Sequence, residues 1–113
     1  MILEFKTNKL KRQCEDPCLA QKEYGTSIGF RLTQRIGELL AAKNLFDIKT
    51  IPSARLHRLE GNRNDQYAVD LVHPFRLVIR PLITNKNSIN KLELITVVRI
   101  EEVEDYHGKQ KRR

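Results

Sequence analysis

The stretch TSIGFRLTQRIGELLAAK, residues 26–43, sets the fold class of this chain. Its apolar residues recur every three or four positions, which is the spacing of one face of an α-helix. They are Ile28, Leu32, Ile36, Leu39 and Leu40. Polar side chains, Arg35 among them, fall mostly between these positions. The pattern predicts a helix over about 27–43, with Thr26 or Ser27 capping its first turn.

The segments on either side of this helix follow other patterns. Before it, residues 2–6 read as a short strand, and Lys9 to Cys14 read as a helical turn that ends near Pro17. After a connector over 44–53, the apolar period changes to two. We expect strands over 56–59, 67–71, 75–80 and 92–103, a turn at 60–62 and a long loop at 81–91. The last strand is apolar on both faces around Val97, as a central strand would be. This order predicts an α+β domain, an antiparallel or mixed sheet with N-terminal helices packed on one face.

Length and charge bound the class of protein. The chain has 113 residues, enough for one domain, which we expect over 1–108 with a basic flexible tail over 109–113. Its formal net charge is +7, which favours a polyanionic partner such as nucleic acid. Four of those charges lie in the tail, so the body carries only +3. Evidence for a nucleic-acid partner must therefore come from particular residues and not from the net charge.

Several classes of protein are disfavoured by composition. No apolar run of about 18 residues exists, so no membrane-spanning helix is expected. The N-terminal residues do not resemble a signal peptide, which predicts a cytoplasmic protein with no membrane partner. Cys14 and Cys18 are then expected to be reduced thiols, and they lack further ligands at metal-site spacing. No cofactor and no metal are expected.

Two histidines suit proton transfer. His57 lies in a strand just before a tight turn, and His107 follows Asp105 and Tyr106 at the end of the last strand. Histidines of this kind can cleave a phosphodiester without a metal. A base takes the proton from an RNA 2′-hydroxyl, an acid protonates the leaving 5′-oxygen, and an arginine stabilises the charge on phosphorus. The alternative is that both are surface histidines at strand ends.

Four segments together match the pattern of a known protein family. They are Leu-His-Arg-Leu-Glu-Gly-Asn-Arg (56–63), Gln-Tyr-Ala-Val (66–69), Phe-Arg-Leu (75–77) and Val-Glu-Asp-Tyr-His (103–107). The family pattern runs roughly L-H-x-L-K-G-x-R and ends in E-D-Y-H. In these segments and in the order of elements, most of residues 1–107 resembles the HigB branch of the RelE/ParE toxin superfamily.

The resemblance implies a type II toxin of bacterial toxin–antitoxin pairs. Such a protein is a ribosome-dependent endoribonuclease, an mRNA interferase that cuts translated mRNA in the ribosomal A site. Its partners would be mRNA, the ribosome with its rRNA, and a cognate antitoxin, expected to be a small helix-turn-helix protein. The catalytic residues carried over by position are His57, Arg76, Asp105, Tyr106 and His107. Arg63 and Arg58 are the corresponding candidates for binding RNA phosphate. Which residue is acid and which is base stays open.

Three departures from the family pattern stand out. Glu60 replaces the usual lysine, which reverses a charge beside the expected scissile phosphate. Residues 108–113 extend past the usual end, and the long 81–91 loop is expected to lie away from the matched residues. Two other functions therefore remain: a toxin of the same fold that inhibits DNA gyrase, and a non-catalytic, degenerate nucleic-acid-binding relative.

Overall fold

The structure is a computed structural model that describes residues 1–106. His107 and the tail predicted over 109–113 lie outside the described residues. The helices are α1 (Asn8–Glu15), α2 (Pro17–Tyr24), α3 (Thr26–Ala41) and α4 (Leu45–Lys49). The strands are β1 (Ile2–Phe5), β2 (His57–Arg58), β3 (Tyr67–Asp70), β4 (Phe75–Pro81) and β5 (Val97–Asp105). Single turns of 3₁₀ helix occur at Pro52–Ala54, Gly61–Arg63, Lys86–Asn90 and Leu92–Leu94. The predicted α+β class is confirmed.

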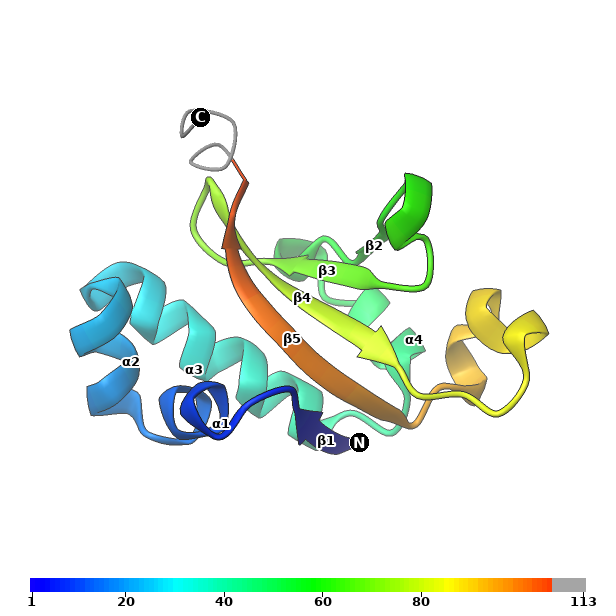
Figure 1. The fold of residues 1–113 in the computed structure, drawn as a ribbon, viewed down its shortest axis with the longest axis horizontal. Coiled ribbons are helices and arrows are strands. Elements are labelled where there is room, and N and C mark those ends of the chain that lie inside the picture. The colour runs from blue at the N-terminus through cyan, green and yellow to red at the C-terminus, as the bar shows by residue number, and fades with distance from the viewer. Residues whose placement is uncertain (107–113) are drawn as a thin grey trace.

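The strands form one mixed five-stranded sheet in the order β1-β5-β4-β3-β2. β1 runs parallel to β5, and the other neighbours are antiparallel. The long β5 crosses the middle of the molecule between β1 and β4 (Figure 1). Its interior position confirms the central strand predicted from apolar residues on both of its faces.

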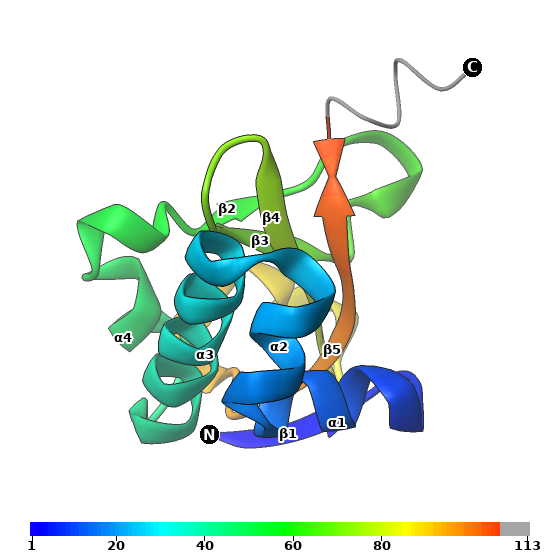
Figure 2. The same ribbon diagram turned by 90° about the vertical axis from the view of Figure 1, so that its left-hand side faces the viewer.

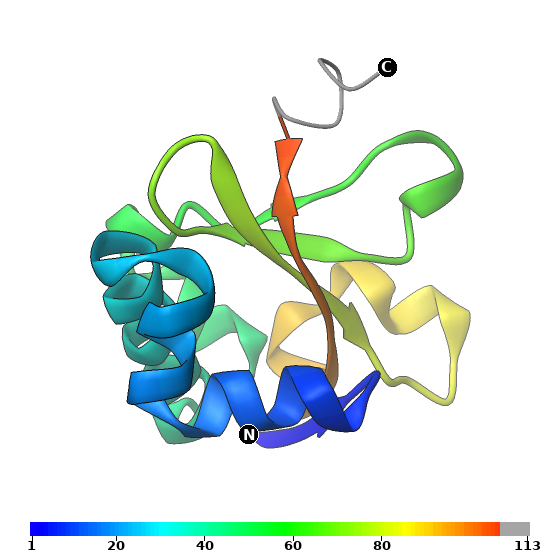
Figure 3. The same ribbon diagram turned by 60° about the vertical axis from the view of Figure 1, so that its left-hand side comes forward.

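The N-terminal helices cover one face of the sheet, as predicted. α2 and α3 lie side by side in front of β3 and β4 (Figure 2), and α1 runs beside β1 (Figure 3). Apolar side chains from both layers are buried between them: Leu32, Leu39, Leu45 and Ile48 from the helices, and Val69, Leu77, Ile79, Val98 and Ile100 from the strands. A smaller cluster of Leu59, Ala68 and Val78 lies apart from this core.

Several element boundaries differ from the predictions. The prediction missed α2, which begins at the proline that ends α1, because Asp16 accepts hydrogen bonds from two backbone N–H groups of the next turn. It also missed α4, which Asn44 caps in the same way inside the predicted connector. The predicted cap of α3 is wrong: the helix starts after Gly25, at φ 89°, with no side-chain cap. β5 starts at Val97, not Leu92.

Arg35 is not on a solvated helix face. Its side chain is 1% exposed, and its Nε donates to the Asp70 carbonyl oxygen at 2.7 Å. Nη2 donates to the Ser53 carbonyl oxygen at 2.7 Å, and Nη1 pairs with Glu38 at 2.9 Å. α3 is therefore tied through one buried cation to the residues before β2 and at the end of β3.

A β-bulge shifts the side-chain alternation of β5. Val78 pairs with Glu102 and Ile79 pairs with Ile100, so Glu101 is the extra residue. The shift places Ile100 and Val103, which are three residues apart, against the same core. It also aligns Glu102 and Glu104 with Val78 and Arg76 of β4, on the face away from the helices.

The two cysteines are free thiols in different settings. Cys14 is buried in the core, and burial, reinforced by Glu15, raises its pKa to about 12. Cys18 is exposed on α2. Within residues 1–106, no helix is both long and apolar enough to cross a membrane.

Two glycines of α3 provide a matched test of the packing between α2 and α3. A Cβ on Gly29 would lie 2.6 Å from the backbone nitrogen of Gln21, whereas a Cβ on Gly37 would meet nothing within 4 Å. We expect Gly29→Ala to lower the free energy of unfolding by about 1–3 kcal/mol, because the helices must separate. Gly37→Ala should raise it by about 1 kcal/mol through helix propensity. Urea denaturation measures both, and equal effects would contradict the close packing.

Candidate functional site

A cleft of about 570 Å³ opens beside β2, at the connection between β3 and β4 and the end of β5. Five residues singled out in the sequence line it together: His57, Arg58, Arg63, Arg76 and Tyr106. They come from β2, the turn after β2, β4 and the residue after β5. Segments far apart in the chain thus contribute to one basic, partly enclosed surface.

Two predicted residues are not part of this lining. Asp105 pairs with Phe75 in the register of β4 and β5, so it lies on the opposite side of β5 from Glu104. His107 falls outside the described residues. Four further ionisable residues line the cleft that the sequence patterns did not single out as site residues: Arg55, Glu60, Asp70 and His73. Glu60 was noted only as a departure from the family pattern.

His57 is oriented by the backbone of a nearby residue. Its Nδ1 lies 2.8 Å from the carbonyl oxygen of Arg55. Because a carbonyl oxygen only accepts hydrogen bonds, the neutral ring carries its hydrogen on Nδ1 and its lone pair on Nε2. Nε2 is therefore the atom through which a neutral His57 can accept a proton, and the residue lines the cleft.

Arg55 has an unusual backbone conformation. It is left-handed, with φ 44° and ψ 54°, which costs a non-glycine residue about 1–2 kcal/mol. Its side chain is held by Asp70, with Nε to Oδ2 at 2.7 Å and Nη2 to Oδ1 at 3.1 Å. This hydrogen bond and the charge of Asp70 raise the pKa of Arg55. The pair fixes the residue whose carbonyl orients His57. No sequence motif marks the Arg55–Asp70 pair, because the pairing depends on where β3 ends.

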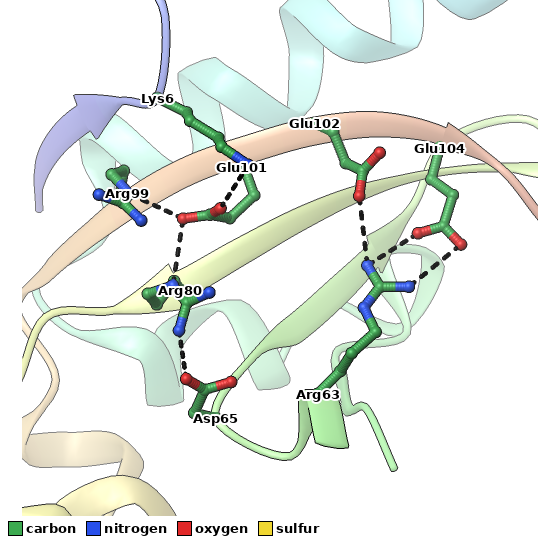
Figure 4. A network of polar contacts seen from close by, with 8 residues as sticks. All are labelled: Lys6, Arg63, Asp65, Arg80, Arg99, Glu101, Glu102 and Glu104. Carbon is green, nitrogen blue, oxygen red and sulfur yellow. Dashed lines mark hydrogen bonds and ion pairs between the residues drawn. The ribbon is translucent and has the colours of Figure 1, made fainter. Parts of the chain in front are cut away.

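A row of three charged residues crosses the sheet beside the cleft. In the register of β3, β4 and β5, Asp70 pairs with Arg76, and Arg76 pairs with Glu104. Glu104 is 4% exposed and accepts from Arg76 at 3.1 Å and from Arg63 at 2.9 Å. Arg63 also reaches Glu102 at 3.4 Å (Figure 4). Arg63, predicted to bind phosphate, and Arg76, predicted to be catalytic, thus share one buried carboxylate.

The pKa of Glu104 is set by opposing effects. Burial acts to raise it, but the hydrogen bond from Arg63 and the charges of Arg76 and Arg63 outweigh burial. The pKa therefore lies below its ordinary value of 4.5, and Glu104 is ionised at neutral pH. The same hydrogen bond raises the pKa of Arg63.

Arg76 also contacts an aromatic ring. Its guanidinium carbon lies 4.6 Å from the centroid of the Tyr106 ring, within range of a cation–π interaction. Its Nε is buried and donates no hydrogen bond to any residue in the range 1–106. Tyr106 is 41% exposed. Arg76 therefore keeps one buried N–H donor for which residues 1–106 provide no acceptor.

The 81–91 segment does not lie away from the matched residues, contrary to the prediction. Arg58 donates from Nη1 to Oδ1 of Asn90 at 2.5 Å, and from Nε to the carbonyl oxygen of Asn64 at 2.5 Å. The Tyr67 hydroxyl donates to the carbonyl oxygen of Ile89 at 2.8 Å. The 3₁₀ turn Lys86–Asn90 brings Ile89 and Asn90 to these partners, and no pattern in the sequence predicts that turn.

The lining fits acid–base chemistry on a phosphate ester. One cleft is lined by the oriented imidazole of His57, four arginines and two carboxylates. Among residues 1–106, histidine, cysteine, aspartate and glutamate side chains nowhere gather in a group of three that could hold a metal ion. The arrangement offers a base and cations at the same place.

Comparison with models of known protein families finds no match, and no curated protein sequence matches the chain either. The described residues define a mixed α+β domain with a basic cleft at one end of its sheet.

The buried position of Glu104 gives a pH test. Its pKa is lower in the folded protein, so its pairing contributes stability above pH 4.5 that is lost as the pH falls below that value. We expect Glu104→Gln to lower the free energy of unfolding at pH 7 by about 3 kcal/mol, since two arginines lose their carboxylate. The difference from wild type should shrink toward pH 3.

The matched control is Glu102→Gln, because Glu102 is 47% exposed and, within residues 1–106, pairs only with Arg63, at 3.4 Å. That variant should lose less than about 1 kcal/mol. Denaturant titrations across the pH range measure both variants. A Glu104→Gln deficit that stays constant from pH 7 to pH 3 would contradict the assignment.

Proposed function

We propose that this chain is the toxin of a type II toxin–antitoxin system, similar to the HigB branch of the RelE/ParE superfamily. It acts as an endoribonuclease that cuts translated mRNA on the ribosome. The observation that carries the proposal is the convergence of His57 with Arg58, Arg63 and Arg76 in one cleft. The sequence resemblance had selected these same residues.

The proposed reaction is attack by the RNA 2′-hydroxyl on the adjacent phosphorus. Nε2 of His57 takes the proton from the hydroxyl, and the 2′-oxygen forms the new bond to phosphorus. Arg76 stabilises the negative charge that builds on the phosphate oxygens. The bond to the 5′-oxygen breaks, and that oxygen takes a proton from an acid at the end of β5, where Tyr106 and His107 are the candidates. The products are a 2′,3′-cyclic phosphate and a 5′-hydroxyl.

The proposed partners follow from the same reading. mRNA and rRNA are polyanions that suit a cleft lined by four arginines. A cognate antitoxin, a small helix-turn-helix protein, would hold the toxin inactive in the bacterial cytoplasm. The exposed carboxylate of Glu60 in the cleft disfavours phosphate locally, so Arg58 and Arg63 must offset it.

A second candidate is a non-catalytic nucleic-acid-binding protein. Arg63 and Arg76 share Glu104, so their charges are partly neutralised before any RNA arrives. That observation favours binding through phosphate contacts over strong stabilisation of a transition state. The experiment below separates the two candidates, and it also tests the gyrase-inhibiting alternative.

The first test is cleavage in a translating extract, with mRNA 5′ ends mapped. We expect cuts that require the ribosome, and a rate about 10²–10⁴-fold lower for His57→Ala, because the base is lost. Added imidazole should restore part of that rate, which a merely structural histidine would not allow. Thermal unfolding checks that the variant folds.

Other results would redirect the proposal. Intact messages together with blocked DNA supercoiling by gyrase would favour the gyrase-inhibiting toxin. Intact messages, unaffected gyrase and salt-dependent RNA binding would favour the non-catalytic candidate. Cleavage by His57→Ala at the wild-type rate would remove His57 from the mechanism.

The second test concerns the charge at position 60. Glu60→Lys should speed cleavage about tenfold, because a cation replaces a carboxylate beside the phosphate. The control is Glu93→Lys, which makes the same charge change at an exposed residue that lines neither this cleft nor the neighbouring one. Equal acceleration by both variants would indicate a general effect of net charge.

A further inference from the structure

A second cleft of about 450 Å³ lies beside the first and shares Arg58 with it. Its walls are the 62–65 segment and the 81–89 segment, and Arg80 of β4 also lines it. The two clefts are neighbours on either side of one arginine, so a chain-like ligand in the first can extend into the second.

The wall formed by the 81–89 segment is fixed to the sheet. Asn90 accepts from Arg58, and the carbonyl oxygen of Ile89 accepts from the hydroxyl of Tyr67, which is itself buried. Asn85 caps the 3₁₀ turn by accepting from the backbone nitrogen of Asn87 at 2.9 Å. The cleft is therefore part of the fold, not a gap beside a loose loop.

The lining of the second cleft combines charge, amides and apolar surface. Arg58, Arg80 and Lys86 contribute positive charge against one carboxylate, Asp65. Arg80 is already paired with Asp65 and with Glu101 (Figure 4), whereas Lys86 has no ion pair within residues 1–106. Lys86 and Arg58 are therefore the cations best placed to meet a ligand phosphate.

The remaining side chains suit a nucleobase. Asn62 and Asn64 carry amides that can both donate to and accept from the polar edge of a base. Ile83 and Ile89 are half-buried and offer apolar surface to its flat face. An acidic peptide would use the cations but would have no need of the two amides or the apolar wall.

We propose that this second cleft binds one nucleotide of single-stranded RNA, flanking the nucleotide held in the first cleft. Lys86 and Arg58 contact its phosphate, and Asn62 and Asn64 contact its base. This inference rests on the proposed function and adds a subsite to it. It gives the 81–91 segment, which the family pattern lacks, a role in holding the RNA strand.

The test uses 2′-O-methyl RNA, which lacks the nucleophilic hydroxyl, so binding is measured without cleavage. Fluorescence anisotropy follows a series of labelled strands from dinucleotide to octanucleotide. For the wild type we expect affinity to rise in a step at the length that reaches the second cleft. Lys86→Ala should remove that step, weakening the longer strands about tenfold and leaving the dinucleotide unchanged. The slope of log affinity against log salt should fall by about 1.

The matched control is Lys91→Ala, which removes the same charge from the same segment at an exposed residue that does not line the cleft. It should change the affinity for longer strands less than twofold. Asn62→Ala, also at an exposed position, should weaken the longer strands with the salt slope unchanged. Photo-cross-linking with 4-thiouridine placed along the strand should label the 81–90 segment from one position.

The outcomes separate the subsite from the activity. Equal losses of affinity for the longer strands in Lys86→Ala and Lys91→Ala would overturn the subsite. Tighter binding of an oligoglutamate with the same net charge as the RNA would also overturn it. A length step that Lys86→Ala removes, in a protein that never cuts mRNA, would keep the subsite and refute the nuclease. Cleavage of mRNA by a protein whose affinity shows no length step would keep the nuclease and refute the subsite.

Discussion

The buried guanidinium of Arg35 holds together the two segments on which the cleft depends. It reaches from α3 to the carbonyl oxygens of Ser53 and Asp70, both at 2.7 Å. An unpaired charge in this position would cost several kcal/mol, so the fold must deliver these acceptors to the same point. Ser53 lies two residues before Arg55, and Asp70 is the partner of the Arg55 side chain. One cation beneath the sheet thus sets the backbone that orients His57 above it.

The arginines of the cleft stabilise the fold and, under the proposed function, also bind phosphate. Arg63 connects the turn after β2 to β5 through Glu104, and Arg76 uses the same carboxylate while it packs against Tyr106. A ligand phosphate would have to share these guanidinium groups with Glu104, so each contact would contribute less to the free energy of binding. In return, the cations are already ordered when the ligand arrives, so little side-chain entropy is lost on binding. The buried carboxylate therefore holds the arginines in place before a ligand arrives, but it also neutralises part of their positive charge.

The sequence was sufficient to predict the elements whose apolar residues recur at a regular spacing. Helical spacing located α3, and alternation located β3 and β4, because both patterns reflect burial of one face. The residues of the cleft were found through short motifs, which selected His57, Arg63 and Arg76 without indicating what else surrounds them. Arg35 looked like a surface residue because the oxygens that bind it are distant in sequence. The burial of Glu104 could not be predicted either, since nothing in the local sequence shows that the bulge at Glu101 turns it toward two arginines.

The contrast between the two cysteines has a practical consequence. Cys14 is inaccessible, and its thiol, with a pKa of about 12, remains protonated at any pH used for thiol chemistry. Cys18 is exposed on α2, and α2 contributes no residue to either cleft. A maleimide dye will therefore attach at a single position of the natural sequence and leave both clefts unmodified. The protein carries its own attachment point for fluorescence measurements of ligand binding.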